Sequence, residues 1–165
     1  FEKASAVSQD VTEGYVIGAD STVVWQDLPI GKPTDIDDAR RMLRELRGTK
    51  HEVTTGVTII EVKSGRHITD SMTSNITLRE YSDQEIEESI ARGTPMDKAG
   101  AYAIQDELFK PGEMTNGCYT NVIGLPLCRL NEMFTKFGVE LPTGPNIEST
   151  INCRIQCPFQ GNSKL

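Results

Sequence analysis

The sequence has no long apolar run. No stretch approaches the roughly 18 consecutive apolar residues that a membrane-spanning helix needs. The chain also does not open with the charged, apolar and small-residue regions of a secretory signal peptide. We therefore expect no membrane partner and a cytoplasmic location.

Cysteine and histidine are both scarce, with four and two residues respectively. Four irregularly spaced cysteines do not make a disulfide framework in a chain of this size. Cys153 and Cys157 form a C-x3-C pair, but no second pair follows, and His51 and His67 lie far upstream. A zinc site needs four such ligands, so we expect free thiols.

An excess of basic charge is also missing. Lysine and arginine number 17 against 24 acidic residues, which gives a net charge of -7. This balance argues against a nucleic-acid polymer as partner. With 165 residues, 37% of them hydrophobic and 25% charged, the chain is typical of one soluble globular domain. A small anionic ligand would need a locally positive pocket.

Four segments carry strand patterns. The run "GYVIGAD" predicts a strand buried on both faces that ends at Asp20, and the next residues, "STVVWQD", are expected to continue it or to pair beside it. The segments "HEVTTGVTIIEV" and "HITDSMTSNITLREY" flank the turn "KSGR" and predict a long antiparallel pair. The segment "GCYTNVIGLP" predicts a strand that ends at Gly124.

Three segments carry helix patterns with start and stop signals. After Thr34 as the expected cap, "DIDDARRMLRELRG" predicts a helix that Gly48 ends. Its apolar face is expected to comprise Ile36, Ala39, Met42, Leu43 and Leu46. Ser82 and Glu85 form a capping box before a short helix. Pro126 opens a last helix with Leu127, Leu130, Phe134 and Phe137 on one face, and "FEKASAVSQD" reads as the tail of an amphipathic helix.

The alternation of these elements predicts an α/β domain with a mixed twisted sheet and flanking helices. We place the domain at residues 1–141 and treat residues 142–165 as a C-terminal extension of uncertain order. The segment "TPMDKAGAYAIQDELF" fits no period and is expected to be a structured loop that carries function.

Charged residues at these boundaries are the candidates for chemistry. Asp20 could bind a divalent cation or orient water at a strand end, although a turn or cap residue is the plainer reading. Lys32 in "GKP" does not fit the Walker pattern and could be an ordinary surface lysine held extended by Pro33. Asp97 and Lys98 lie in the candidate loop, where Gln105 could read a base edge. Together these residues suggest a polyphosphate held by lysines and a metal ion held by carboxylates.

Several stretches occur in the order and spacing of one known family. "VIGADSTVV", "GKP", "DARRMLRELRGTKHEVTTGV", "DKAGAYAIQ" and "NVIGLPL" together resemble the Maf family, the septum-formation-associated nucleoside triphosphate pyrophosphatases. The resemblance runs from residue 1 to about residue 138 and implies a fold like those of Maf and inosine triphosphate pyrophosphatase. It also implies hydrolysis of a nucleoside triphosphate to monophosphate and pyrophosphate with a divalent metal such as Mg or Mn.

The resemblance also implies roles for individual residues. Asp20 matches the catalytic acid that holds the metal and orients or deprotonates water, and Asp97 matches a nearby acid that we take as a second metal ligand. Lys3, Lys32 and Lys98 match lysines that neutralise phosphate charge. Ser21 and Gln105 match positions tied to substrate choice, and "DKAGAYAIQ" resembles the branch that acts on dTTP and UTP.

The chain departs from the family in three places. Ser21 stands where the family usually has Thr, and "DELFKPGEM" adds acids after Gln105, which leaves the preferred base open. The family's N-terminal serine and arginine motif and a metal-binding acid would lie before Phe1, so the chain from Phe1 could be inactive. A homodimer is expected from the resemblance alone. The alternative to an enzyme is a nucleotide-binding regulator of division and septum formation that does not turn its ligand over.

Overall fold

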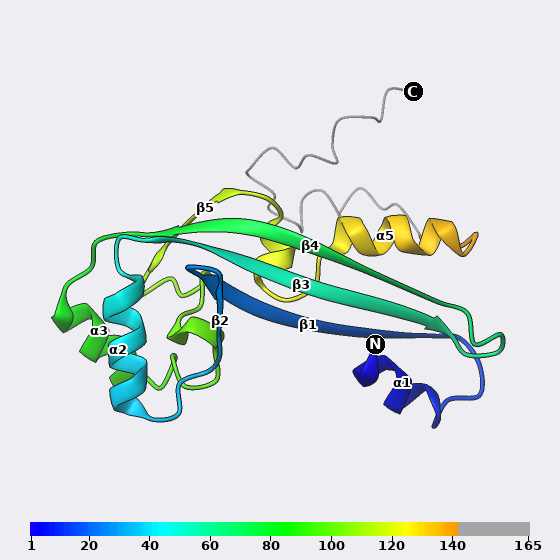
Figure 1. The fold of residues 1–165 in the computed structure, drawn as a ribbon, viewed down its shortest axis with the longest axis horizontal. Helices are drawn as coiled ribbons and strands as arrows, with labels where there is room; N and C mark the ends of the chain where they lie inside the picture. The colour runs from blue at the N-terminus through cyan, green and yellow to red at the C-terminus, as the bar shows by residue number, and fades with distance from the viewer. Residues whose placement is uncertain (142–165) are drawn as a thin grey trace. The chain divides into compact units, whose positions relative to one another are not determined.

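The structure, a computed structural model, describes residues 1–141 (Figure 1). Its five strands form one sheet in the order β2-β1-β3-β4-β5. They are β1 (Tyr15–Trp25), β2 (Leu28–Ile30), β3 (Lys50–Glu61), β4 (His67–Leu78) and β5 (Gly112–Asn116). The helices are α1 (Glu2–Ser8), α2 (Ile36–Leu46), α3 (Asp83–Ala91), α4 (Tyr119–Val122) and α5 (Leu127–Lys136), with the 3-10 turn η1 (Ala99–Ala101). The expected α/β class is confirmed. The predictions for residues 142–165, including those for Cys153 and Cys157, lie outside the described residues.

The chain divides into two compact units that share the long strands β1, β3 and β4. The first unit comprises residues 1–21, residues 55–73 and the chain from Gly117 onward. The second unit comprises residues 22–54 and 74–116. The predicted antiparallel pair of β3 and β4 is confirmed, since these strands are neighbours in the sheet and Glu61 N–H donates to the Arg66 carbonyl across their turn.

Side-chain alternation gives the first unit two apolar clusters. Val16 of β1 packs with Ala4 of α1 and Ile60 of β3. Tyr15 and Ala19, which alternate with Val16 along β1, instead pack against the cluster formed by Val57, Ile59, Leu130, Met133 and Phe134. Figure 1 accordingly shows α1 and α5 on different sides of these strands. Each helix therefore covers one face.

The second unit is built on α2 and α3. The predicted capping box of α3 is present, because Glu85 N–H donates to the Ser82 hydroxyl while the Glu85 carboxylate accepts from Ser82 N–H. Four side chains of α2 are buried as predicted: Ala39, Met42, Leu43 and Leu46. Arg40 and Arg44 of α2 form ion pairs with Glu87 and Asp83 of α3. These ion pairs hold α2 and α3 against each other.

Three local predictions were wrong. β1 does not end at Asp20 but runs to Trp25, which is the continuation expected as one alternative for "STVVWQD". Only Val16 and Val23 in it are buried, because the β-branched residues after Asp20 suit a half-exposed strand that pairs antiparallel with β2. Residues 119–122 form the short helix α4 instead of a strand, between Gly117 and Gly124, both at positive φ.

The start of α2 was also misplaced. Its N-cap is Asp35, one residue after Thr34, and the Asp35 carboxylate accepts from Asp38 N–H at 2.8 Å. Ile36, expected on the buried face, is 52% exposed because it occupies the first turn. Thr34 still contributes, since its N–H donates to the Asp38 carboxylate at 3.0 Å.

Candidate functional site

A glycine in β1 brings α1 close enough to place Lys3 beside Asp20. A Cβ at Gly18 would lie 2.8 Å from the backbone nitrogen of Ala4, so only glycine allows this approach of the helix. Lys3 directly precedes Ala4 in α1, and Asp20 lies two residues after Gly18 along β1, on the same face of the strand. The Lys3 Nζ donates to the Asp20 Oδ1 at 2.5 Å.

The Lys3–Asp20 pair is open to solvent. The side chain of Lys3 is 67% exposed and that of Asp20 is 71% exposed. An exposed pair of this kind adds little to stability. The other carboxylate oxygen of Asp20, Oδ2, has no hydrogen-bond partner within residues 1–141 and is available to a water molecule or a cation. The pair therefore contributes little to holding the fold and leaves the Asp20 carboxylate accessible to solvent.

Ser21 points to the opposite face of β1 from Asp20, because successive strand residues alternate. Its hydroxyl lies 2.7 Å from the Thr55 hydroxyl, and Thr55, fully buried in β3, donates to the Asn121 carbonyl at 2.9 Å. Thr55 has one proton and gives it to Asn121, so Ser21 must be the donor to Thr55. The structure thus ties Ser21 into the protein interior and does not bring its hydroxyl to the face that carries Asp20.

The second unit gathers the other charged candidates on two joined loops. Lys98 Nζ donates to the Asp97 Oδ1 at 2.6 Å. The pKa of Asp97 is lowered, first by this hydrogen bond and to a smaller extent by the nearby charge of Lys32. Gly100 N–H donates to the Gly31 carbonyl at 3.1 Å, which links the "DKAG" and "GKP" loops. Two lysines and one carboxylate therefore share one small region.

The loop between η1 and β5 holds Gln105 at the surface, where it is exposed. The next residue, Asp106, is partly buried, and its Oδ1 accepts from the N–H groups of Leu108 and Phe109 at 3.0 and 2.9 Å. Arg92 lies 3.7 Å from its other oxygen. The acid that follows Gln105 thus shapes the loop, and Glu107 remains exposed beside it.

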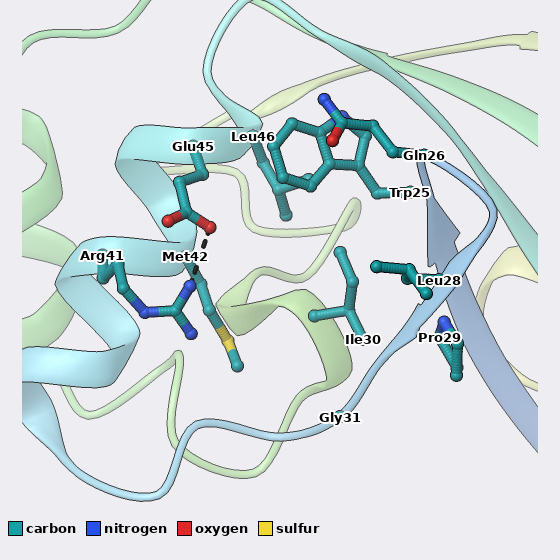
Figure 2. Close-up of a pocket in the computed structure, with 10 residues that line it drawn as sticks. All are labelled: Trp25, Gln26, Leu28, Pro29, Ile30, Gly31, Arg41, Met42, Glu45 and Leu46. Carbon is teal, nitrogen blue, oxygen red and sulfur yellow. Dashed lines mark hydrogen bonds and ion pairs between the residues drawn. The ribbon is translucent and has the colours of Figure 1, made fainter.

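A cavity of about 290 Å³ opens in the second unit between the β1–β2 hairpin and α2 (Figure 2). Figure 2 shows Trp25 and Gln26 at one end and Arg41 with Glu45 across from Ile30. Its lining is Trp25, Gln26, Leu28, Pro29, Ile30, Gly31, Arg41, Met42, Glu45 and Leu46. None of the predicted site residues lines it, although Gly31 directly precedes Lys32.

The carboxylates offer a cation few ligands. Within residues 1–141 no group of three or more His, Cys, Asp or Glu side chains could hold a metal ion. Asp20 and Asp97 each have a lysine partner and each remains exposed. Magnesium is commonly held by one or two carboxylates together with substrate phosphates, so isolated carboxylates fit that mode and not a protein cage. Separately, none of the described helices is long and apolar enough to cross a membrane.

Comparison with known proteins places the chain in a family. The model of the family described as Maf-like protein matches residues 1–137. The chain belongs to the Maf family. Its curated relatives include the dTTP/UTP pyrophosphatase of Dictyoglomus thermophilum, 44% identical over 139 residues, which cover 84% of this chain and 72% of that protein.

Two other relatives are also named dTTP/UTP pyrophosphatase and have similar identity to this chain. The dTTP/UTP pyrophosphatase of Dictyoglomus turgidum is 42% identical over 141 residues, covering 86% of this chain and 73% of that protein. The dTTP/UTP pyrophosphatase of Desulforamulus reducens is 40% identical over 139 residues, which cover 84% of this chain and 73% of that protein. The resemblance drawn from the motifs alone is thereby confirmed.

The Maf motifs fall into two groups in the structure. "VIGADSTVV" meets "NVIGLPL" in the first unit through Ser21, Thr55 and Asn121. "GKP" meets "DKAGAYAIQ" in the second unit through Gly31 and Gly100. Thr55 was not among the predicted site residues, although it lies within the stretch "TTGV", because a threonine in a strand rich in β-branched residues gives no signal that its hydroxyl is used.

Proposed function

We propose that the protein hydrolyses nucleoside triphosphates, with dTTP and UTP as the preferred substrates, to a monophosphate and pyrophosphate. The observation that carries the proposal is the group of Lys32, Asp97 and Lys98 on two linked loops, in a chain whose net charge is -7. A local positive group on an acidic protein is what a polyphosphate ligand requires. The Maf relatives, which are dTTP/UTP pyrophosphatases, suggest the substrate class.

The proposed roles follow the chemistry of each side chain. Asp20 accepts a hydrogen bond from the attacking water and orients it, or takes its proton. Lys32 and Lys98 neutralise phosphate charge, and Lys3 holds the Asp20 carboxylate in place while adding a third positive charge. Gln105 reads the base edge from its exposed position.

We further propose that a divalent cation, Mg or Mn, is bound with the substrate, with Asp20 and Asp97 as the candidate protein ligands. When bound, such a cation neutralises phosphate charge and increases the acidity of coordinated water. The exposed carboxylate oxygens support this assignment. We also propose that residues 1–141 act as one Maf-like domain, that the protein works as a homodimer, and that it is cytoplasmic.

The test measures pyrophosphate release from dTTP, UTP, CTP, GTP and ATP with Mg²⁺ or Mn²⁺. It is run on the chain from Phe1 and on a version extended ahead of Phe1 by the family's serine and arginine motif. Asp20→Asn keeps the size of the side chain but removes its charge and is expected to lower turnover about 100-fold or more. Asp10→Asn removes the same charge at an exposed position outside the site and is the matched control.

The outcomes separate the hypotheses. Release confined to dTTP and UTP, lost in Asp20→Asn and kept in Asp10→Asn, supports the proposal. Nucleotide binding without release by either chain would instead favour the regulator that binds and does not cleave. Sedimentation analysis of the same samples tests the homodimer.

A further inference from the structure

Beneath the loop that carries Asp97 and Lys98 lies a buried pair of polar side chains. His51 of β3 is 4% exposed and Tyr102, which follows η1, is 6% exposed. The His51 Nε2 and the Tyr102 hydroxyl are 2.5 Å apart, and the two rings meet edge to face with centroids 5.3 Å apart. Both residues belong to the second unit, so the contact lies inside one compact body.

Burial keeps both partners uncharged. It lowers the pKa of His51 to about 4 and raises the pKa of the Tyr102 phenol above its usual value. The hydrogen bond between them is therefore a bond between neutral groups throughout the neutral pH range. A buried polar group that loses such a partner pays its full desolvation cost, so each residue depends on the other for its position.

The pair is placed to fix a strained stretch of loop. Gly100 and Ala101, immediately before Tyr102, have φ of 73° and 62°. The left-handed region is costly for a residue with a Cβ, so Ala101 stays there only where its surroundings hold it. On one side the Gly100 N–H is bonded to the Gly31 carbonyl, and on the other Tyr102 is bonded to His51.

We propose that His51 and Tyr102 are positioning residues that hold the loop of Asp97 and Lys98 in the geometry that binds the substrate's phosphates. They do not touch the substrate, and they act through the two residues between Lys98 and Ala101. The proposal rests on the proposed function for its kinetic consequence. Its structural part, the ordering of the loop, can be tested without turnover.

The main variant is Tyr102→Phe, which removes only the hydroxyl. We expect kcat/KM for dTTP to fall about tenfold, mainly through a higher KM, because a shifted lysine loses ground-state contact with phosphate. The matched control is Tyr81→Phe, since Tyr81 is also buried in the same unit but its hydroxyl donates to the Leu43 carbonyl at 2.7 Å, outside the loop. Tyr81→Phe is expected to keep kcat/KM within about twofold.

Replacement of His51 gives an independent arm. In His51→Gln the side-chain amide can still bond to Tyr102, whereas in His51→Leu it cannot. We expect the KM of His51→Gln for dTTP to stay close to the wild-type value and the KM of His51→Leu to rise as far as that of Tyr102→Phe. Equal KM values for these two His51 variants, or equal kinetics for Tyr102→Phe and Tyr81→Phe, would overturn the proposal.

Two measurements do not depend on turnover. Amide hydrogen exchange at Gly100 should become faster in Tyr102→Phe than in Tyr81→Phe, while exchange in α5 stays unchanged. Binding of inorganic tripolyphosphate, followed by calorimetry, should weaken in Tyr102→Phe and not in Tyr81→Phe. If the wild type binds tripolyphosphate but hydrolyses no nucleotide, the proposed function fails while these two results still decide the positioning role. Unchanged exchange and unchanged binding would refute it.

Discussion

The buried His51 should make the protein sensitive to mild acid. Its pKa is lowered from 6.5 to about 4 by burial, so the folded chain keeps it neutral while the unfolded chain takes up a proton below pH 6.5. The stabilising contribution of neutral His51 is complete above pH 6.5 and is lost as the pH falls towards 4. A pKa difference of about 2.5 at 1.36 kcal/mol for each pKa unit corresponds to about 3 kcal/mol. That is a large share of the roughly 5–15 kcal/mol that stabilises a typical domain.

Urea unfolding followed by circular dichroism between pH 7.5 and 4 measures this loss. We expect the wild type to lose about 3 kcal/mol more than His51→Gln over that range. His67→Gln makes the same change at the exposed histidine and should follow the wild type. Carboxylates affect stability at lower pH. The pKa of Glu85, for example, is lowered to about 2, first by Arg79 and then by the Ser82 N–H. The wild type and both variants contain the same carboxylates, so this contribution cancels in the comparison. Parallel curves for the wild type and His51→Gln would refute the reasoning.

Three further substitutions test the packing and charge of the site. Gly18→Ala should destabilise the protein by about 1–3 kcal/mol in urea unfolding, because its Cβ would strike the backbone of α1, whereas Gly56→Ala, with nothing within 4 Å of its Cβ, should not. Thr55→Val should cost about 1 kcal/mol, because it removes the hydrogen bond to the Asn121 carbonyl and the acceptor of the Ser21 hydroxyl, and it should leave the dTTP to UTP rate ratio unchanged; a changed ratio would contradict this. Lys32→Ala should weaken nucleotide binding about tenfold at low salt and less at high salt, as calorimetry would measure, and unchanged affinity would remove Lys32 from the phosphate site.

Local signals in the sequence predicted the helices well. The capping box at Ser82 and the buried face of α2 depend on residues within one or two turns of each other, so the sequence contains all of the relevant physics. The misplaced end of β1 shows the limit of this approach. Whether Asp20 stops a strand depends on whether β2 pairs beside the residues that follow, and that pairing is not encoded in "VIGADSTVV".

The motifs predict which residues belong to the site, and that membership stays a prediction, whereas the contacts among these residues could not be predicted from the sequence. The motifs identified Lys32, Asp97 and Lys98 because each lies in a recognisable stretch. Their association depends on the Gly100–Gly31 hydrogen bond between segments 69 residues apart, which follows from φ angles that the sequence alone does not fix. Tyr102 was overlooked for the same reason, since its partner His51 is 51 residues away.

Because side chains alternate between the two faces of β1, the adjacent residues Asp20 and Ser21 have different surroundings. Asp20 faces Lys3 with its side chain 71% exposed, whereas Ser21 donates into the interior to Thr55. A hydroxyl already used in this way can only accept a further hydrogen bond. Any influence of Ser21 on substrate choice would then pass through the packing around Thr55 and Gly124, whose Cβ position lies 3.7 Å from the Ser21 hydroxyl. Serine can therefore replace the threonine that is usual in the family at this position. The hydroxyl that bonds to Thr55 is kept, and the methyl group that is lost forms no hydrogen bond.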